Sequence, residues 1–367
     1  MAFLNSLTKP LSRIIGLEGT MPTTTSLNDQ TENIQTDPEE MRVAIGTYKP
    51  ATDDFLRFAS QLGVKDVLVT PHRHEGFESA LPLGTAWSVD ELSGLRNRAN
   101  DAGLRLYAVE KMPIPLYEIL LNDGDRQAQL DVITETIRNM GAAGIHVLGY
   151  SGHPPDGAVR TTREYAVRGG SKASAFDIDD LETVSRSELQ RDVTEAEMWD
   201  RYEEFLAEVI PVAEDAGVKL GVHPSDPPVE ELFGIPLLFR NFENFERALS
   251  IHSSENHGLK LCLGCWSEMG EDIPEVIRHF GDEHDIIYVH FRDVVGTVPK
   301  FYETFVDDAD GNFDEYEVIQ ALGEVGFSGV MTPDHVPLME GETDWEFGST
   351  LGRSYTVGYL KGMLKSI

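Results

Sequence analysis

Short apolar runs and longer amphipathic stretches alternate along most of the chain. The apolar runs are rich in β-branched side chains and end at polar or turn-forming residues, which is the pattern of buried strands in a parallel sheet. We therefore expect strands at or within residues 41–48, 65–74, 104–115, 144–150, 219–228, 259–268, 286–293 and 329–337.

The amphipathic stretches between these runs predict helices. Ser88 and Glu91 have the spacing of a capping box, so one helix is expected to begin there and to end near Gly103. Eight strands that alternate with helices predict an α/β fold, a (β/α)8 TIM barrel, as a single catalytic domain over residues 41–367. Further helices are expected at residues 55–62, 130–140, 195–217, 241–250, 273–280 and 316–325.

Two segments interrupt this alternation. Residues 1–40 are rich in Thr, Asn, Ser and Asp and lack an apolar period, so we expect an N-terminal tail or loose arm. The connection after the fourth strand, residues 151–194, is the longest in the barrel. Long connections at the active face of a barrel often form lids or binding loops, so a lid-like loop is expected here.

The long connection is also basic, with Arg160, Arg163, Arg168 and Lys172 close together. A basic cluster in a chain with a large excess of acidic residues indicates contact with an anion, and Arg160 is expected to bind the substrate. The alternative is that these side chains pair with nearby acidic residues.

Composition excludes several classes of partner. The chain has 63 acidic and 30 basic side chains among 367 residues, a formal net charge of −33. Such a surface repels nucleic acid and anionic membranes, and no apolar run approaches the ~20 residues of a membrane-spanning helix. The two cysteines lie three positions apart and cannot build a disulfide framework. We expect a cytoplasmic homo-oligomer that acts on a small molecule.

The acidic residues are spread along the chain, which we interpret as adaptation to high salt; an ordinary acidic cytosolic enzyme is the alternative. Because dissolved ions screen the repulsion between surface charges, the melting temperature should rise between dilute buffer and molar KCl. Thermal denaturation across a series of KCl concentrations checks this prediction. A melting temperature that stays level or falls would favour the alternative.

Four of the expected strands end in residues that bind metals. His223, Cys262 and His290 close three of them, Asp334 closes the last, and Cys265 is a second candidate beside Cys262. Because the carboxyl ends of the strands of a parallel barrel meet on one face, these side chains are expected to converge on one divalent ion.

Two imidazoles, one thiolate and one carboxylate restrict the choice of metal. The sulfur and nitrogen ligands disfavour Mg²⁺ and Ca²⁺ and suit transition metals. Catalysis also needs open coordination positions, which favours an ion with more than four ligands over structural Zn²⁺. We expect Mn²⁺, with Fe²⁺, Co²⁺ or Ni²⁺ as alternatives.

Other residues at strand ends complete the expected site. His72 and His74 follow the second strand and are expected to contact the substrate.

Cys262 and Cys265 would point to opposite faces of an extended strand, so both can face the ion only if the chain turns between them at Gly264.

The motifs GVHPSDPP, LKLCLG, VHFRD and TPDH, together with AVEKMPIP and GIHVLGY, resemble the mannonate dehydratase family. The resemblance extends from about residue 41 to the C-terminal GYLKGML. It implies a metal-dependent barrel of the xylose-isomerase-like type. The implied activity is that of a hydro-lyase in hexuronate degradation, which removes water from D-mannonate to give 2-keto-3-deoxy-D-gluconate.

Transferred motif by motif, the resemblance also implies roles for single residues. His335 would act as the acid or base, Arg292 would take part in catalysis and bind the substrate carboxylate, and Tyr355 is the nearest counterpart of a family tyrosine. The family sequence HPDDPP reads HPSDPP here, with Ser225 in place of the first Asp. The implied metal ligands are His223, Cys262, His290 and Asp334.

Two other functions stay open at this point. One is a metal-dependent sugar isomerase or epimerase of the xylose-isomerase-like barrels, for which Glu110 at the end of the third strand would supply a carboxylate ligand. The cysteine ligand argues against it. The other is a barrel that binds a sugar acid without catalysis.

Overall fold

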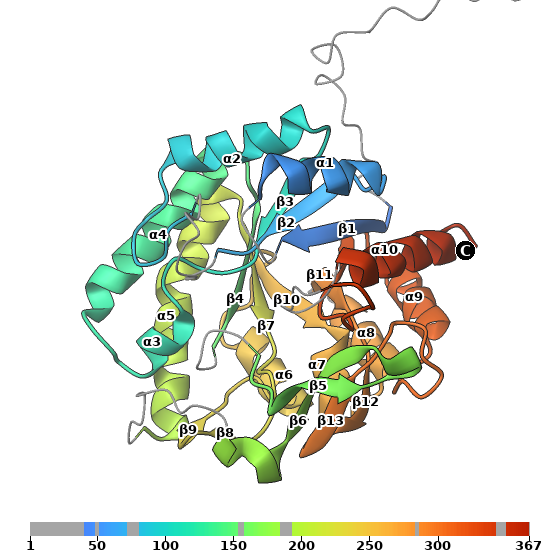
Figure 1. Cartoon of the computed structure of the whole chain (residues 1–367). Helices are drawn as coiled ribbons and strands as arrows, with labels where there is room; N and C mark the ends of the chain where they lie inside the picture. The colour runs from blue at the N-terminus through green and yellow to red at the C-terminus, as the bar shows by residue number, and fades with distance from the viewer. Residues whose placement is uncertain are drawn as a thin grey trace, which may run out of the picture.

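The computed structural model describes residues 40–47, 51–71, 81–152, 158–183, 193–282, 286–342 and 350–366. Within these residues eight parallel strands close into a barrel in the order β1-β14-β11-β10-β7-β4-β3-β2 (Figure 1). Each expected strand is present, so the predicted barrel is confirmed. The strands are β1 (Arg42–Thr47), β2 (Asp66–Val69), β3 (Arg105–Val109), β4 (Val147–Ser151), β7 (Lys219–His223), β10 (His257–Cys262), β11 (Ile286–Phe291) and β14 (Val330–Pro333).

Helices cover the outside of the barrel (Figure 1). The expected capping box is present, because the Ser88 side chain accepts from the backbone N–H of Glu91 and the Glu91 side chain accepts from that of Ser88. The long helix α5 ends, as expected, at Gly217, whose φ of 63° is readily adopted by glycine. The helices are α1 (Asp53–Gln61), α2 (Val89–Asp101), α3 (Leu116–Leu120), α4 (Arg126–Ala142), α5 (Glu195–Ala216), α6 (Phe242–Ser250), α7 (Leu263–Met269), α8 (Ile273–Asp282), α9 (Glu315–Glu324) and α10 (Thr350–Leu364).

The core lies between the helices and the barrel. Helix α5 shows why its sequence folds this way: Trp199, Phe205, Leu206 and Val209 recur at helical spacing and are fully or almost fully buried. Full burial of one large apolar side chain contributes about 1.5–3 kcal/mol. The apolar period recognised in the sequence is therefore the packing face of the helix.

The connection after β4 contains more structure than the expected loop. Its described part holds β5 (Thr162–Ala166) and β6 (Lys172–Asp177), which pair antiparallel. Strand β6 also pairs with β13 (Lys300–Glu303), and β13 pairs with β12 (Val294–Thr297). We call this four-stranded sheet, in the order β12-β13-β6-β5, the accessory sheet (Figure 1).

Physical reasons explain why these strands were missed. All five residues of β5 are exposed, so the segment lacks the alternation that marks a half-buried strand. Its sheet is completed by β12 and β13, which lie far away in the sequence. A lid function for this connection remains a prediction.

Two expectations fall outside the described residues. The tail at residues 1–40 is one, apart from Glu40, and the segment with His72 and His74 is the other.

None of the helices within the described ranges has both the length and the apolarity needed to cross a membrane.

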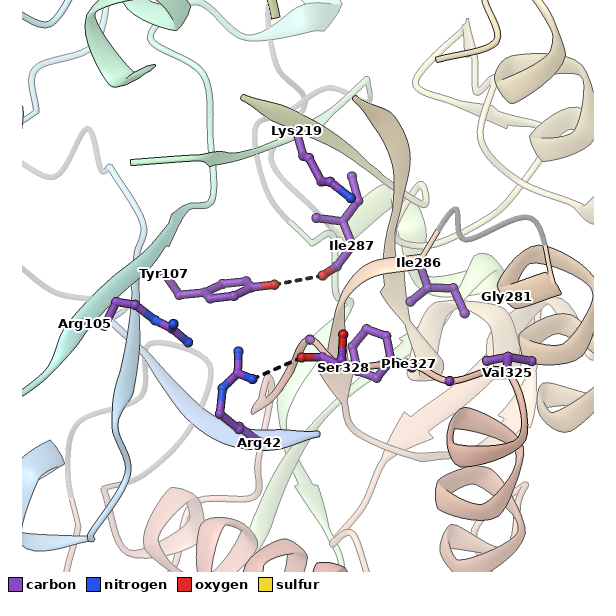
Figure 2. Close-up of a pocket in the computed structure, with 12 residues that line it drawn as sticks. Arg42, Arg105, Tyr107, Lys219, Gly281, Ile286, Ile287, Val325, Phe327 and Ser328 are labelled. Carbon is purple, nitrogen blue, oxygen red and sulfur yellow. Dashed lines mark hydrogen bonds between the residues drawn. The ribbon is translucent and has the colours of Figure 1, made fainter. Parts of the chain in front are cut away.

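A cavity of about 560 Å³ opens at the amino-terminal end of the barrel (Figure 2). Arg42, Arg105, Tyr107 and Lys219 from the starts of β1, β3 and β7 line it together with apolar residues such as Ile287. The Tyr107 hydroxyl donates to the backbone oxygen of Ile287 at 3.1 Å. Active sites of these barrels lie at the opposite, carboxyl end of the strands, and we place the candidate site there.

Candidate active site

Four neighbouring strands deliver the predicted metal ligands to one place. His223 is the last residue of β7, Cys262 is the last of β10, and His290 lies in β11 directly opposite Cys262. Asp334 follows β14. Donor atoms of Cys262, His290 and Asp334 all lie within 4.8 Å of one another. The rings of His223 and His290 are 5.4 Å apart between centroids.

Hydrogen bonds fix which nitrogen of each imidazole is available. His223 Nδ1 lies 2.7 Å from the carbonyl oxygen of Pro224. A carbonyl oxygen only accepts, so Nδ1 carries the proton and Nε2 keeps its lone pair. His290 Nε2 donates to Glu110 Oε1 at 2.7 Å, which leaves Nδ1 facing Asp334 Oδ1 at 3.2 Å.

Glu110 is suited to orient His290. It is buried at the end of β3, where it also accepts from the Thr70 hydroxyl at 2.8 Å and lies 3.3 Å from Lys260 Nζ. Burial alone would raise the pKa of Glu110, but the charges of Lys260 and His290 outweigh it and hold that pKa far below its ordinary value. A carboxylate behind a ligating histidine is a usual feature of metal sites in proteins.

The acidic ligands are held in their anionic forms. The pKa of Cys262 is well below its ordinary value although burial raises it, because a hydrogen bond from Cys265 and the charge of Arg292 stabilise the thiolate. The pKa of Asp334 is likewise depressed against the effect of burial by the charges of His335 and His290. Metal ligands must be deprotonated to bind, so both residues meet this requirement.

The donor set fits a divalent cation. Within the described part of the chain, His290 Nδ1 is buried and makes no well-aligned hydrogen bond. It faces the oxygen of Asp334 and the sulfur of Cys262, and these three possible ligand atoms lie at the ends of three neighbouring strands. Such an arrangement of nitrogen, oxygen and sulfur suits a transition metal.

Cys265 lies on the same side as Cys262. Strand β10 ends at Cys262 and helix α7 begins at the next residue. The chain therefore turns just before Gly264, the residue at which the turn was expected from the sequence. The sulfurs of both cysteines and a nitrogen of His223 lie within 4.8 Å of one another. Burial raises the pKa of Cys265 well above its ordinary value, so Cys265 stays a thiol while the thiolate form is favoured at Cys262.

Two buried arginines connect the ligand set with further carboxylates. Arg292 donates from Nε to Asp334 at 2.8 Å, from Nη1 to Glu268 at 2.8 Å and from Nη2 to Asp226 at 2.9 Å. The absence of a side chain at Gly264 makes room for this guanidinium, since a Cβ there would lie 2.5 Å from Arg292 Nη1. Burial and the charge of Asp226 raise the pKa of Glu268 well above its ordinary value.

Arg160 is the second arginine of this network. Its side chain is fully buried and pairs with both oxygens of Asp226 and with Glu303, whose Oε1 lies 2.7 Å from Nη2. Glu303 in turn accepts from His335 Nδ1 at 2.5 Å. Arg160, which was expected to bind the substrate, therefore shares Glu303 with His335, the proposed acid or base. Its observed contacts are with carboxylates of the protein.

A sequence profile of the family described as D-mannonate dehydratase matches residues 41–195 and 185–367. The chain belongs to this family. It is 32% identical over 328 residues to a mannonate dehydratase of Thermotoga neapolitana, an alignment that covers 80% of this chain and 91% of the relative. D-mannonate dehydratases are hydro-lyases, so the chain is an enzyme of the lyase class.

Solved structures show the same barrel. The mannonate dehydratase from Streptococcus suis serotype 2 has a TM-score of 0.80 at 24% identity and covers 89% of this chain and 95% of that chain. An L-ribulose 3-epimerase has a TM-score of 0.56 at 14% identity, with 89% and 95% covered. At these identities the likeness shows the fold alone, and it confirms the xylose-isomerase-like barrel.

Tyr355 lies apart from the contacts described above. It belongs to α10 and is 39% exposed, its hydroxyl donates to Asp307, and its ring lies 6.0 Å from the guanidinium of Arg168. The catalytic role that the resemblance to the D-mannonate dehydratase family implied for Tyr355 remains a prediction. The substrate contacts of His72 and His74 also remain predictions, because both lie outside the described residues.

Several functional candidates were missed in the sequence. Asp226 stands inside the motif HPSDPP, and its place in a family motif was an available signal. Glu268 lies at the end of the stretch that carries Cys262, and no feature of the sequence distinguishes it from an acidic residue on the surface. Glu303 lies on β13 of the accessory sheet, and only the three-dimensional arrangement brings it to His335.

Proposed function

We propose that this chain removes water from D-mannonate to give 2-keto-3-deoxy-D-gluconate, using a divalent metal ion held by His223, Cys262, His290 and Asp334. Family membership supports the reaction class and the substrate. The observation that carries the metal site is the meeting of Cys262, His290 and Asp334 at the ends of neighbouring strands, with His223 grouped with Cys262. Glu110 lies behind His290.

The difficult step is removal of the proton next to the substrate carboxylate, because negative charge then accumulates on that carboxylate. A bound divalent ion would supply Lewis acidity that offsets this charge. The hydroxide that leaves the neighbouring carbon must also take up a proton to depart as water. His335 contributes at Nε2 either the acceptor of the first proton or the donor of the second, since its Nδ1 is bound to Glu303. Its Nε2 lies 3.9 Å from Asp334 Oδ1, so it is directed toward the ligand set.

Arg292 orients the site in this proposal. It fixes Asp334 through Nε and holds Asp226 through Nη2. These contacts keep the carboxylate of Asp334 turned toward the other ligands. The contribution of Arg292 to catalysis and its direct contact with the substrate carboxylate remain predictions from the family resemblance.

Mn²⁺ is the metal that we propose. One thiolate among two imidazoles and a carboxylate suits the middle of the first transition series, and substrate binding requires open positions. Fe²⁺, Co²⁺ and Ni²⁺ satisfy the same donors. We further propose that the enzyme acts in the cytoplasm, which its low cysteine content supports, and that it forms a homo-oligomer.

An epimerase or isomerase is the second candidate, favoured only by the fold shared with L-ribulose 3-epimerase. The feature that supported it in the sequence was Glu110 as a carboxylate ligand. In the structure both oxygens of Glu110 have partners, Oε1 bonding His290 and Oε2 accepting from Thr70. Glu110 therefore orients a ligand, which favours the dehydratase.

A substrate panel tests the proposed function. The protein is incubated with Mn²⁺ and a set of hexonates, including D-mannonate and D-gluconate, and 2-keto-3-deoxy acids are measured. We expect rapid product formation from D-mannonate that stops when the metal is removed by a chelator. Epimerisation of ketoses without keto-acid formation would support the second candidate, and binding without turnover would support a non-catalytic barrel.

A further inference from the structure

The acid or base proposed at His335 has a partner from outside the barrel. His335 follows the metal ligand Asp334, but its Nδ1 bonds to Glu303, which is the last residue of β13 in the accessory sheet. Glu303 is 2% exposed and His335 is 7% exposed, so water does not compete effectively for this bond. Two separate parts of the fold therefore meet at this hydrogen bond.

Glu303 is kept ionised at that position. Burial raises the pKa of its carboxyl group, but the charges of His335 and Arg160 outweigh burial and lower that pKa to about 2. Arg160 donates to the same oxygen, Oε1, from Nε at 3.1 Å and from Nη2 at 2.7 Å. A charged acceptor makes a stronger hydrogen bond with the imidazole than a neutral one would.

Arg160 is itself immobilised. Its guanidinium pairs with both oxygens of Asp226 and lies 5.0 Å from the ring centroid of Phe301, another residue of β13. Asp226 also accepts from Arg292, which holds the ligand Asp334. Paired, buried guanidinium and carboxylate groups have few alternative positions, so Arg160 fixes the Glu303 carboxylate in the place where it bonds to His335.

We propose that Glu303, held by Arg160, is a positioning residue for His335, and that the accessory sheet is thereby a working part of the active site. The carboxylate accepts the proton on Nδ1 and sets the plane of the ring. Nε2, on the side of Asp334, is then the nitrogen that exchanges a proton with the substrate. The proposal rests on the role given to His335 in the proposed function.

The first test is Glu303→Gln, which keeps the shape of the side chain and removes its charge. We expect kcat for D-mannonate to fall roughly 10- to 100-fold, within the contribution of a well-placed acid or base. KM and metal content should stay close to those of the parent protein. The melting temperature should fall, because Arg160 loses one of its charged partners, so kcat is measured well below it. Asp177→Asn is the matched control, because Asp177 is a carboxylate of the same sheet that pairs with the surface residue Lys300, and its kcat should be unchanged.

A double variant separates positioning from a general structural effect. If Glu303 acts through His335, adding Glu303→Gln to His335→Asn should lower kcat little further, because the group to be positioned is already absent. Losses that multiply in the double variant would overturn the proposal. So would a normal kcat in Glu303→Gln, or a loss that is explained by lower metal content or by unfolding at the assay temperature.

A measurement that does not depend on catalysis tests the positioning role of Glu303 separately from the proposed function. The protein is loaded with diamagnetic Zn²⁺ for this experiment, because the unpaired electrons of Mn²⁺ would broaden signals this close to the ion. In proton and nitrogen NMR, His335 should then show a strongly downfield Nδ1–H signal, assigned by its absence in His335→Asn. Glu303→Gln should shift that signal upfield, and Asp177→Asn should not. A signal that does not shift in Glu303→Gln overturns the positioning role, even if D-mannonate proves to be the wrong substrate. A signal that does shift, in a protein that turns over no sugar acid, would contradict the proposed function alone.

Discussion

Cys262→Ala is expected to empty the metal site and to abolish turnover. Cys262 is the residue shared by two donor groups, one with His290 and Asp334 and the other with His223 and Cys265. Its thiolate is also the ligand whose anionic form the surroundings favour, as the lowered pKa indicates. Metal analysis of the purified proteins should show about one ion per parent chain and almost none in the variant, because binding depends on the deprotonated ligand.

Cys265→Ala is the matched control for this experiment. It makes the same chemical change three positions away, at a cysteine that is equally buried. Because Cys265 is held as a thiol beside Arg292, the control should keep its metal and most of its activity. Full metal content and activity in Cys262→Ala, with loss of both in Cys265→Ala, would transfer the ligand role to Cys265.

His335→Asn is expected to lower kcat by a factor on the order of 100 or more, the usual contribution of a general acid or base. The asparagine amide can still donate to Glu303 from the place that Nδ1 occupies, so the buried carboxylate keeps a partner. The nitrogen on the side of Asp334 is lost. Steady-state kinetics with D-mannonate, together with metal content and melting temperature, measures the effect.

Metal content and melting temperature of His335→Asn should match those of the parent protein, which would place the defect in the chemical step. Near-normal kcat with metal still bound would mean that His335 has only a structural role at the rim of the barrel. The acid or base would then have to be sought at Tyr355, His72 or His74.

The barrel and the ligand set were accessible from the sequence for a physical reason. A strand buried on both faces needs a nearly continuous apolar run, so β11 was visible as such. β10 was visible from Leu259, Leu261 and Cys262, although Lys260 interrupts the run. Parallel topology then requires the ends of those runs to meet, which brought Cys262 and His290 together without any knowledge of distances. Periodicity and topology together therefore sufficed to bring the candidate ligands to one place.

The network behind the ligands was not accessible in the same way. Glu303 looks like a surface residue in the sequence and Arg160 was expected to bind the substrate, yet both are buried and paired with each other. Their burial depends on the pairing of β6 with β13, which no local pattern specifies. The position of Cys265 was also conditional on a turn, and the turn follows from the start of α7 directly after Cys262.

The pairing of Arg160 with Asp226 and Glu303 has a consequence for loop exchange, a common route to barrel enzymes with altered substrate range. Transplanting the connection after β4 from a relative would replace Arg160, while the two buried carboxylates stay with the recipient. Removing one partner of a buried ion pair costs about 3–5 kcal/mol because the remaining charge is uncompensated. A viable chimera therefore has to exchange Arg160, Asp226 and Glu303 as one unit, although they come from three separate segments of the chain.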